Sequence, residues 1–327
     1  MLKEKDPSIL FSEASSGDRR SLGRLITMIE DGDKESQVIS SLAFKTPGHS
    51  HLIGITGAPG AGKSTLTSAV VSQYRRAFKS VAVLAIDPSS PFSGGAILGD
   101  RVRMGDHVLD TEVYVRSLAT RGELGGLAAC VPEVARLMDA MGFDVVIIET
   151  VGVGQVEVEI AALADTTVVV VNPGWGDAVQ ANKAGLMEIA DIFVVNKSDR
   201  PGAKETARDI EAMLDMSNLN AWRPPVCLTV GIDGSGAAEL CEKIQKHLEF
   251  ADESGLLSKH RSNRLKEELE RKVASELFGR AKSMMENTSV KSLVESVIKG
   301  EIDPHEAAVK VVDLVMVEEG FHAQKSH

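Results

Sequence analysis

An α/β fold with a doubly wound, mainly parallel sheet is predicted by two features of this sequence. Short apolar runs alternate with helical stretches through the middle of the chain, an order typical of strands joined by helical crossovers. The runs end at Thr56, Ile86, Glu149, Val171, Val195 and Thr229. Residues 113–116 are predicted to add another strand. With 327 residues, the chain can bury one α/β core of about 200 residues together with accessory elements.

The two ends of the chain lack strand signals and are predicted to be helical extensions of a central domain, residues 46–252. Residues 1–45 carry one apolar stripe at helical spacing, which comprises Leu22, Leu25, Ile26 and Ile29. Residues 253–327 carry three consecutive stripes, the first of which comprises Leu265, Leu269, Val273, Leu277 and Phe278. Beyond a completed α/β unit these stripes have little to bury against, so residues 253–327 are expected to form a helical arm that makes a homodimer.

Residues 57–64 spell G-x-x-x-x-G-K-[ST], the pattern of a phosphate-binding loop (P-loop). An expected strand precedes this loop, and a helical stretch free of Pro and Gly follows it. The alternative is an ordinary Gly-rich turn, which would need neither of these flanking elements. Glycines allow successive backbone N–H groups to point at phosphate oxygens. Lys63 would reach the β- and γ-phosphates, and the Ser64 hydroxyl would bind Mg²⁺. The expected phosphate contacts are Gly57, Ala58, Pro59, Gly60, Ala61, Gly62, Lys63, Ser64 and Thr65.

A second motif, N-K-x-D, follows another apolar run and predicts which base is bound. The Asp199 carboxylate can accept hydrogen bonds from guanine N1–H and the 2-amino group, whereas adenine has no donor at either place. The stem of Lys197 can lie over the base, and Asn196 can bridge the loop and the base. Val230 and Gly231 stand where Ser-Ala is usual, and their backbone N–H groups are expected to reach the guanine oxygen. The sequence therefore predicts GTP rather than ATP.

Acidic residues end two of the predicted strands. Asp87 and Glu149 would emerge at the carboxyl edge of a parallel sheet, where their oxygens suit Mg²⁺; the alternative is that either acid caps a turn. Between them lies a Ser/Gly-rich stretch, residues 88–104, interpreted as a switch loop in which Asp100 contacts metal or nucleotide. A solvated loop with a structural Arg–Asp pair is the alternative. The predicted catalytic set is Lys63, Asp87, Asp100 and Glu149, and the predicted metal ligands are Ser64, Asp87, Asp100 and Glu149.

Residues 149–152, Glu-Thr-Val-Gly, parallel the D-x-x-G segment that senses the γ-phosphate. The Gly152 N–H can bond that phosphate and release it after hydrolysis. Gln155 lies two residues beyond the position at which small signalling GTPases carry their water-positioning glutamine, so we assign it no catalytic role. Slow intrinsic hydrolysis that depends on a partner is the expected behaviour.

Together these segments resemble the MeaB/ArgK-type GTPases, which are grouped with the nickel-insertion and signal-recognition GTPases. The matching stretches are residues 57–65, 87–90, 99–101, 149–155, 172–177, 183–185, 188–191 and 196–199. The resemblance implies a GTPase chaperone that protects a cobalamin-dependent acyl-CoA mutase, such as methylmalonyl-CoA mutase, and gates adenosylcobalamin delivery. It also implies a homodimer and an additional switch, at residues 174–183, that faces the partner.

Composition limits the other possibilities. A net charge of −11 argues against nucleic-acid binding and against a basic membrane patch. No apolar run reaches the length of about 18 residues that a membrane span needs, and the start lacks a signal pattern. Three dispersed cysteines indicate a reducing compartment, so we expect a cytoplasmic protein. A nickel-insertion GTPase and a P-loop kinase of a transport system are the alternative functions, although the eight histidines show no ligand spacing.

Overall fold

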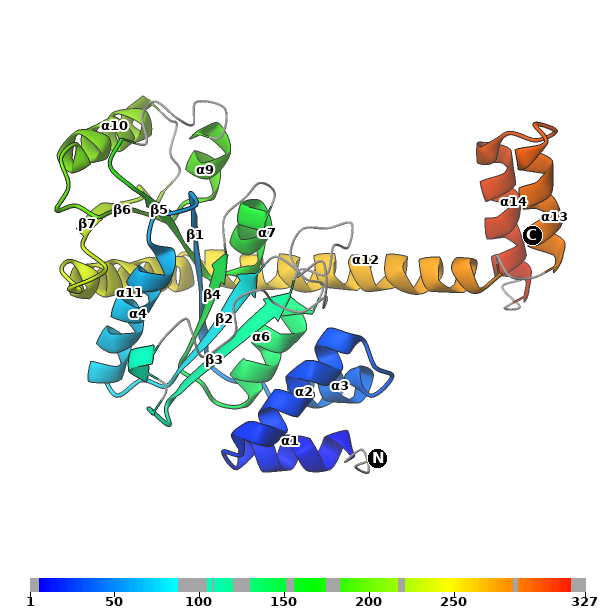
Figure 1. The fold of residues 1–327 in the computed structure, drawn as a ribbon, viewed down its shortest axis with the longest axis horizontal. Helices are drawn as coiled ribbons and strands as arrows, with labels where there is room; N and C mark the ends of the chain where they lie inside the picture. Colours follow the sequence, from blue (N-terminus) through cyan, green and yellow to red (C-terminus); the bar gives the residue numbers. More distant parts are fainter. Residues whose placement is uncertain are drawn as a thin grey trace. The chain divides into compact units, whose positions relative to one another are not determined.

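The computed structural model describes residues 6–87, 105–107, 109–119, 130–150, 156–174, 183–216, 221–284 and 288–318. The chain forms two compact units, Met1–Arg261 and Ser262–His327. The first contains a single sheet with helices on both faces and three N-terminal helices (Figure 1). The second contains helices alone.

The sheet has seven strands, all parallel, in the order β3-β2-β4-β1-β5-β6-β7. The strands are β1 (His51–Gly57), β2 (Val81–Asp87), β3 (Val113–Ala119), β4 (Val145–Thr150), β5 (Thr166–Val171), β6 (Ile192–Asn196) and β7 (Val226–Thr229). The predicted doubly wound parallel sheet is confirmed, and the additional strand predicted at residues 113–116 extends to Ala119. The central strands read as continuous apolar runs because helices cover them on both faces.

Two layers of helices bury the sheet. One face is covered by α4 (Lys63–Arg76) and α11 (Ala237–Glu253), which pack on Ile53 and Ile55 of β1. Leu52, which directly precedes Ile53, faces the opposite layer because side chains alternate along the strand. The helices of that layer are α6 (Val131–Ala140), α7 (Val156–Leu163), α9 (Lys183–Ile189) and α10 (Ala203–Met216) (Figure 1).

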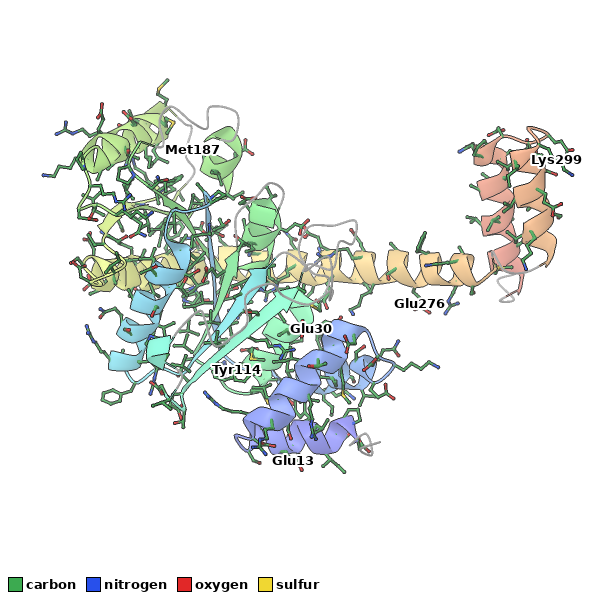
Figure 2. The ribbon with its side chains drawn as sticks, viewed as in Figure 1. Glu13, Glu30, Tyr114, Met187, Glu276 and Lys299 are labelled. Carbon is green, nitrogen blue, oxygen red and sulfur yellow. The ribbon has the colours of Figure 1, made fainter. Side chains whose placement is uncertain are left out.

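Three N-terminal helices, α1 (Pro7–Ser15), α2 (Arg19–Asp31) and α3 (Ser36–Lys45), extend the second layer. The predicted stripe of α2 is buried in the hydrophobic cluster that contains the sheet side chains of β2 and β3. The carboxylate of Asp18 accepts N–H bonds from the first turn of α2 and therefore caps this helix. On β3, Arg116 forms an ion pair with Glu30, and Tyr114 lies where α2 meets the strand (Figure 2).

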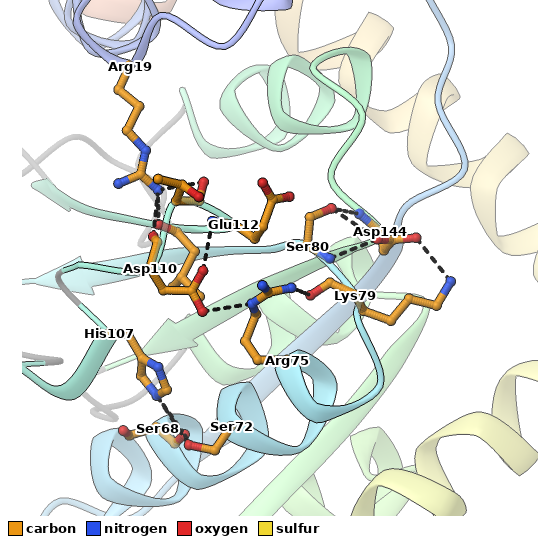
Figure 3. A network of polar contacts seen from close by, with 12 residues as sticks. Arg19, Ser68, Ser72, Arg75, Lys79, Ser80, His107, Asp110, Glu112 and Asp144 are labelled. Carbon is orange, nitrogen blue, oxygen red and sulfur yellow. Dashed lines mark hydrogen bonds and ion pairs between the residues drawn. The ribbon is translucent and has the colours of Figure 1, made fainter.

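Polar contacts tie the amino ends of three strands to the end of α4 (Figure 3). The Arg75 guanidinium lies 2.8 Å from the Asp110 carboxylate, just before β3, and the Lys79 ammonium lies 3.0 Å from Asp144, just before β4. One turn of 3-10 helix, η1 (Gly105–His107), contacts α4 through the His107 ring. Contacts among its own side chains therefore stabilise the amino edge of the sheet. Ligands of open α/β sheets bind at the opposite, carboxyl edge.

An ion pair between Arg261 and a buried carboxylate joins the sheet to the start of α12 (Leu256–Met284). Two nitrogens of Arg261, Nη2 and Nε, donate to the carboxylate oxygens of Asp165 at 2.6 and 3.1 Å, and Nη2 also donates to the carbonyl of Ser50. Asp165 is fully buried and accepts a further bond from the N–H of Leu52. The hydrogen bond to Asp165 also raises the pKa of Arg261.

We expect Arg261→Met to lower the free energy of unfolding by about 3 kcal/mol, because it would leave the buried Asp165 charge without its bidentate partner. Arg280→Met on the same helix is the matched control. Arg280 forms an exposed i,i+4 pair with Glu276, and its loss should cost no more than about 0.5 kcal/mol. Urea unfolding curves of the two variants give the comparison. Equal effects would show that the Asp165 pair contributes no more than a surface pair.

A chain of buried side chains runs between β1, β5 and α11. His51 Nε2 lies 2.8 Å from Thr166 Oγ1, which lies 2.9 Å from His247 Nδ1, and His247 Nε2 lies 3.2 Å from the Asp191 carboxylate. Burial lowers the pKa of His51 to about 4, despite the nearby Asp165 charge. The folded protein therefore holds His51 neutral at pH values where the unfolded chain would protonate it.

This shift predicts a loss of stability in acid. The unfolded chain binds a proton near pH 6.5 and the folded chain only near pH 4, so up to about 3 kcal/mol of stability is lost as pH falls between these values. His51→Gln should flatten the pH dependence by that amount, and His49→Gln, an exposed histidine of the same segment, is the control. Denaturant unfolding at several pH values measures both. Parallel curves for wild type and His51→Gln would refute the depressed pKa.

The second unit consists of the rest of α12 with α13 (Thr288–Ile298) and α14 (Pro304–Glu318). Asp303 caps α14 by accepting bonds from two N–H groups of the first turn. The predicted apolar residues of α12 are exposed, from 43% at Leu265 to 71% at Phe278. Phe278 directly follows Leu277 and so lies about 100° further round the helix than Leu277. None of the helices in the described ranges is long and apolar enough to span a membrane.

Candidate nucleotide-binding site

The predicted motifs meet at the carboxyl edge of the sheet. The P-loop begins at the end of β1, Glu149 lies near the end of the neighbouring β4, and Asn196 ends β6. From β1 the chain continues to β2 on one side of the sheet, whereas from β5, the strand beside β1, it continues to β6 on the other side (Figure 1). Such a topological switch point leaves a crevice at the strand ends, where ligands of open α/β sheets bind.

The P-loop is held in shape by its own backbone and by Lys63. The N–H of Ala61 donates to the Ala58 carbonyl, and α4 begins at Lys63, so the positive end of the helix faces the loop. Lys63 is buried, and its Nζ donates to the carbonyls of Gly57 at 2.7 Å and Ala58 at 3.0 Å. The ammonium group is thereby held across the loop, in reach of a phosphate that enters it. Around it, Pro59, Gly60 and Thr65 are exposed.

Gly62 is needed where the loop meets the base-recognition motif. Its φ is +88°, and a Cβ built there would lie 2.5 Å from Nδ2 of Asn196. Asn196 itself is buried and fully hydrogen bonded: Nδ2 donates to the Ala61 carbonyl, and Oδ1 accepts from the Thr229 hydroxyl and the Gly231 N–H. One amide therefore connects the P-loop, the N-K-x-D motif and the loop after β7.

The other residues predicted to recognise the base are Lys197, Asp199 and Val230. Lys197 has a left-handed backbone, with φ +58°, and its Nζ donates to the Gly60 carbonyl at 2.6 Å. A lysine held in this sparsely populated conformation is typical of functional sites. Asp199 is exposed. The expected backbone donor Val230 instead gives its N–H to the carbonyl of Ser235, closing its loop.

Ser64 and Glu149 bring a hydroxyl and a carboxylate together beside the P-loop. The Ser64 hydroxyl donates to the Glu149 carboxylate, which is only 2% exposed. A hydroxyl and a carboxylate beside a phosphate loop are hard donors of the kind Mg²⁺ accepts, so these residues fit the metal. Asp87 ends β2, but its side chain, like Asp100, Gly152 and the switch residues 175–182, lies outside the described residues.

Two hydrogen bonds near the site join residues whose contact no sequence motif predicts. The Thr229 hydroxyl orients Asn196, and the hydroxyls of Thr56 and Thr150 meet between β1 and β4. Thr150 falls inside the Glu-Thr-Val-Gly segment, yet its sequence position gives no indication of its partner, because that depends on strand register.

Comparisons with known proteins show the family to which the chain belongs. The family model of the methylmalonyl-CoA mutase-associated GTPase MeaB matches residues 22–286. A putative GTPase of Pyrococcus horikoshii is 43% identical over 311 residues, which cover 94% of this chain and 98% of that protein. The GTPase ArgK of Escherichia coli is 35% identical over 293 residues, which cover 85% of this chain and 88% of that protein.

Two further relatives extend the comparison. The mitochondrial methylmalonic aciduria type A homolog of Caenorhabditis elegans is 33% identical, with 84% of this chain and 74% of that protein covered. A crystal structure of an LAO/AO transport system kinase shares the fold, with a TM-score of 0.69 and 24% identity over 97% of this chain and 99% of that one. The chain is a GTPase, and it belongs to the MeaB family of methylmalonyl-CoA mutase-associated GTPases.

Proposed function

We propose that GTP hydrolysis by this chain gates the delivery of adenosylcobalamin to a cobalamin-dependent acyl-CoA mutase, such as methylmalonyl-CoA mutase, and that the chain protects this mutase. The observation that carries the proposal is the family match over residues 22–286, which includes far more than the P-loop. The name of the nematode relative, which refers to methylmalonic aciduria, supports the same partner. The cytoplasm is the expected location of this function.

The proposed chemistry is the attack of water on the γ-phosphate of GTP. Lys63 binds the β- and γ-phosphates, with the P-loop N–H groups around them. Ser64 and Glu149 hold Mg²⁺, together with Asp87 and Asp100. When bound, Mg²⁺ neutralises the negative charge that develops on the phosphate oxygens.

Base recognition and switching complete the proposed cycle. Asp199 accepts both guanine N–H donors, and Lys197 covers the base. The Gly152 N–H senses the γ-phosphate, and residues 174–183 form a second switch that contacts the mutase. The Thr206 hydroxyl, which accepts a bond from the Gly174 N–H at 3.2 Å, supports the start of that second switch.

The exposed stripe of α12 supports a homodimer. Leu269 and Val273 are 64% and 50% exposed, and a second copy would remove this apolar surface from water. We expect a dimer in light scattering at micromolar concentration, and a monomer when Leu269 and Val273 are both replaced by Glu. Arg271→Glu introduces the same charge on the opposite side of α12 and should leave the dimer intact. A monomeric wild-type protein would exclude this part of the proposal.

The decisive experiment measures GTP turnover by the purified protein in Mg²⁺, with and without a cobalamin-dependent acyl-CoA mutase from the same organism. Slow turnover that rises severalfold with the mutase, in parallel with adenosylcobalamin transfer, is the expected result. An ATP arm tests the base, and labelled γ-phosphate distinguishes transfer to water from transfer to an acceptor. Turnover that is indifferent to the mutase would contradict the proposed partner while leaving the GTPase site intact.

A further inference from the structure

Two buried threonines meet where β1 and β4 end. The Oγ1 atoms of Thr56 and Thr150 lie 3.0 Å apart, and both residues are at most 1% exposed. The backbone register of the two strands ends one residue earlier, at the pair of Ile55 and Glu149. The hydroxyl pair therefore continues the connection between these two strands by one residue, while Thr56 still pairs with Val169 of β5 and Thr150 with Ile86 of β2.

The position of this pair relates it to the nucleotide site. Thr56 directly precedes Gly57, the first residue of the P-loop, and Thr150 directly follows Glu149. Side chains alternate along a strand, so Glu149 faces Ser64 on the α4 side and Thr150 faces the opposite layer. The threonines thus do not contact Ser64, and their influence on Glu149 passes through the backbone.

Both threonines are shielded from solvent, and the strand that carries Thr56 is closely packed two residues earlier. Two residues before Thr56, on the same face of β1, Gly54 lies against α7; a Cβ built there would come within 2.4 Å of Ile160 and 3.0 Å of Ala164. Helix α7 therefore packs directly on the backbone of β1. A hydrogen bond in such a dry environment is stronger than at a surface, and a hydroxyl that loses its partner there cannot be rescued by solvent.

We propose that Thr56 and Thr150 are positioning residues for GTP hydrolysis. Their hydroxyl pair holds the carboxyl ends of β1 and β4 together, and so keeps the Glu149 carboxylate against Ser64 at the start of α4. The inference rests on the proposed role of Glu149 and Ser64 in holding Mg²⁺. Displacements of about 1 Å at a reacting centre can cost about a hundredfold in rate, so a link of this kind affects catalysis without touching the nucleotide.

Isosteric variants test the inference. Thr56→Val and Thr150→Val each remove one hydroxyl and keep the side-chain shape. We expect each to lower kcat for GTP about tenfold and to raise the Mg²⁺ concentration needed for half-maximal activity, while the KM for GTP, which Lys63 and Asn196 control, stays within about twofold. Thr56→Ser and Thr150→Ser retain the hydroxyl and should restore both values.

The double variant and a control distinguish positioning from stability. Thr56→Val/Thr150→Val removes both hydroxyls, so no buried hydroxyl is left without a partner, and its kcat should fall less than the product of the single effects. The double variant can also be measured if a single variant fails to fold. Thr166→Val is the matched control. It removes a buried, hydrogen-bonded hydroxyl at the amino edge of the same sheet and should lower the melting temperature without changing kcat or the Mg²⁺ dependence.

The outcomes separate the possible failures. If both single Val variants are destabilised like Thr166→Val but keep the wild-type kcat and Mg²⁺ dependence, the threonines are structural and the inference is wrong. If GTP hydrolysis by the wild-type protein needs no divalent cation, the metal role of Glu149 and Ser64 fails, and the inference fails with it.

Discussion

Lys63→Ala is expected to lower GTP turnover by at least about a hundredfold, because it removes the only side-chain cation that the P-loop motif directs at the phosphates. In the structure, Lys63 Nζ donates to the carbonyls of Gly57 and Ala58 and is held across the loop. With a triphosphate bound, the Lys63 ammonium would stabilise the negative charge that develops on the leaving-group oxygens. Conversion of GTP to GDP in quenched samples under single-turnover conditions, with excess protein, measures the chemical step apart from product release.

Lys79→Ala is the control for this variant. Lys79 follows the other end of α4, is about half exposed and pairs with Asp144, so its loss should leave turnover unchanged. The melting temperatures of both variants establish that each is folded. Wild-type turnover by a folded Lys63→Ala protein would refute the assignment of residues 57–64 as the phosphate site.

Asp199→Asn is expected to change the base that the site accepts. A carboxylate accepts both N1–H and the 2-amino group of guanine, whereas an amide presents one acceptor and one donor. Xanthine carries a carbonyl oxygen where guanine carries the 2-amino group, so it matches the amide. We expect GTP binding to weaken about a hundredfold and xanthosine triphosphate to become the preferred substrate. Displacement of a bound fluorescent nucleotide analogue by GTP and by xanthosine triphosphate measures this preference.

Asp209→Asn provides the comparison for the base exchange. Asp209 lies exposed on α10, so the same chemical change there should leave the preference for GTP as it is. Asn196 is a poor alternative target, because its amide also holds the P-loop and the loop after β7. Undiminished selectivity for GTP in Asp199→Asn would remove Asp199 from the base site.

Much of the fold could be predicted because its signals are local. Each strand reads as a short apolar run, and the P-loop lies between a strand and a helix within about 25 residues, the span of one strand–loop–helix unit. The confirmed parallel sheet then brings Lys63, Glu149 and Asn196 to one edge, since the carboxyl ends of parallel strands share it.

The supporting contacts could not be predicted because they depend on register and packing between distant segments. Arg261 and Asp165 are 96 residues apart, and Thr56 and Thr150 are 94 apart. No periodicity indicates that these side chains meet. The Val230 N–H illustrates the same point, since its bond to Ser235 follows from the closure of one loop rather than from the residue type.

The most direct measurement is a calorimetric titration of the purified protein with GDP and with ADP in the presence of Mg²⁺. The contacts of Asn196, the position of Asp199 and the P-loop predict one GDP bound per chain, with ADP at least about a hundredfold weaker. ADP that binds as tightly as GDP, or a chain that binds neither, would contradict the guanine site assembled at the carboxyl edge of the sheet.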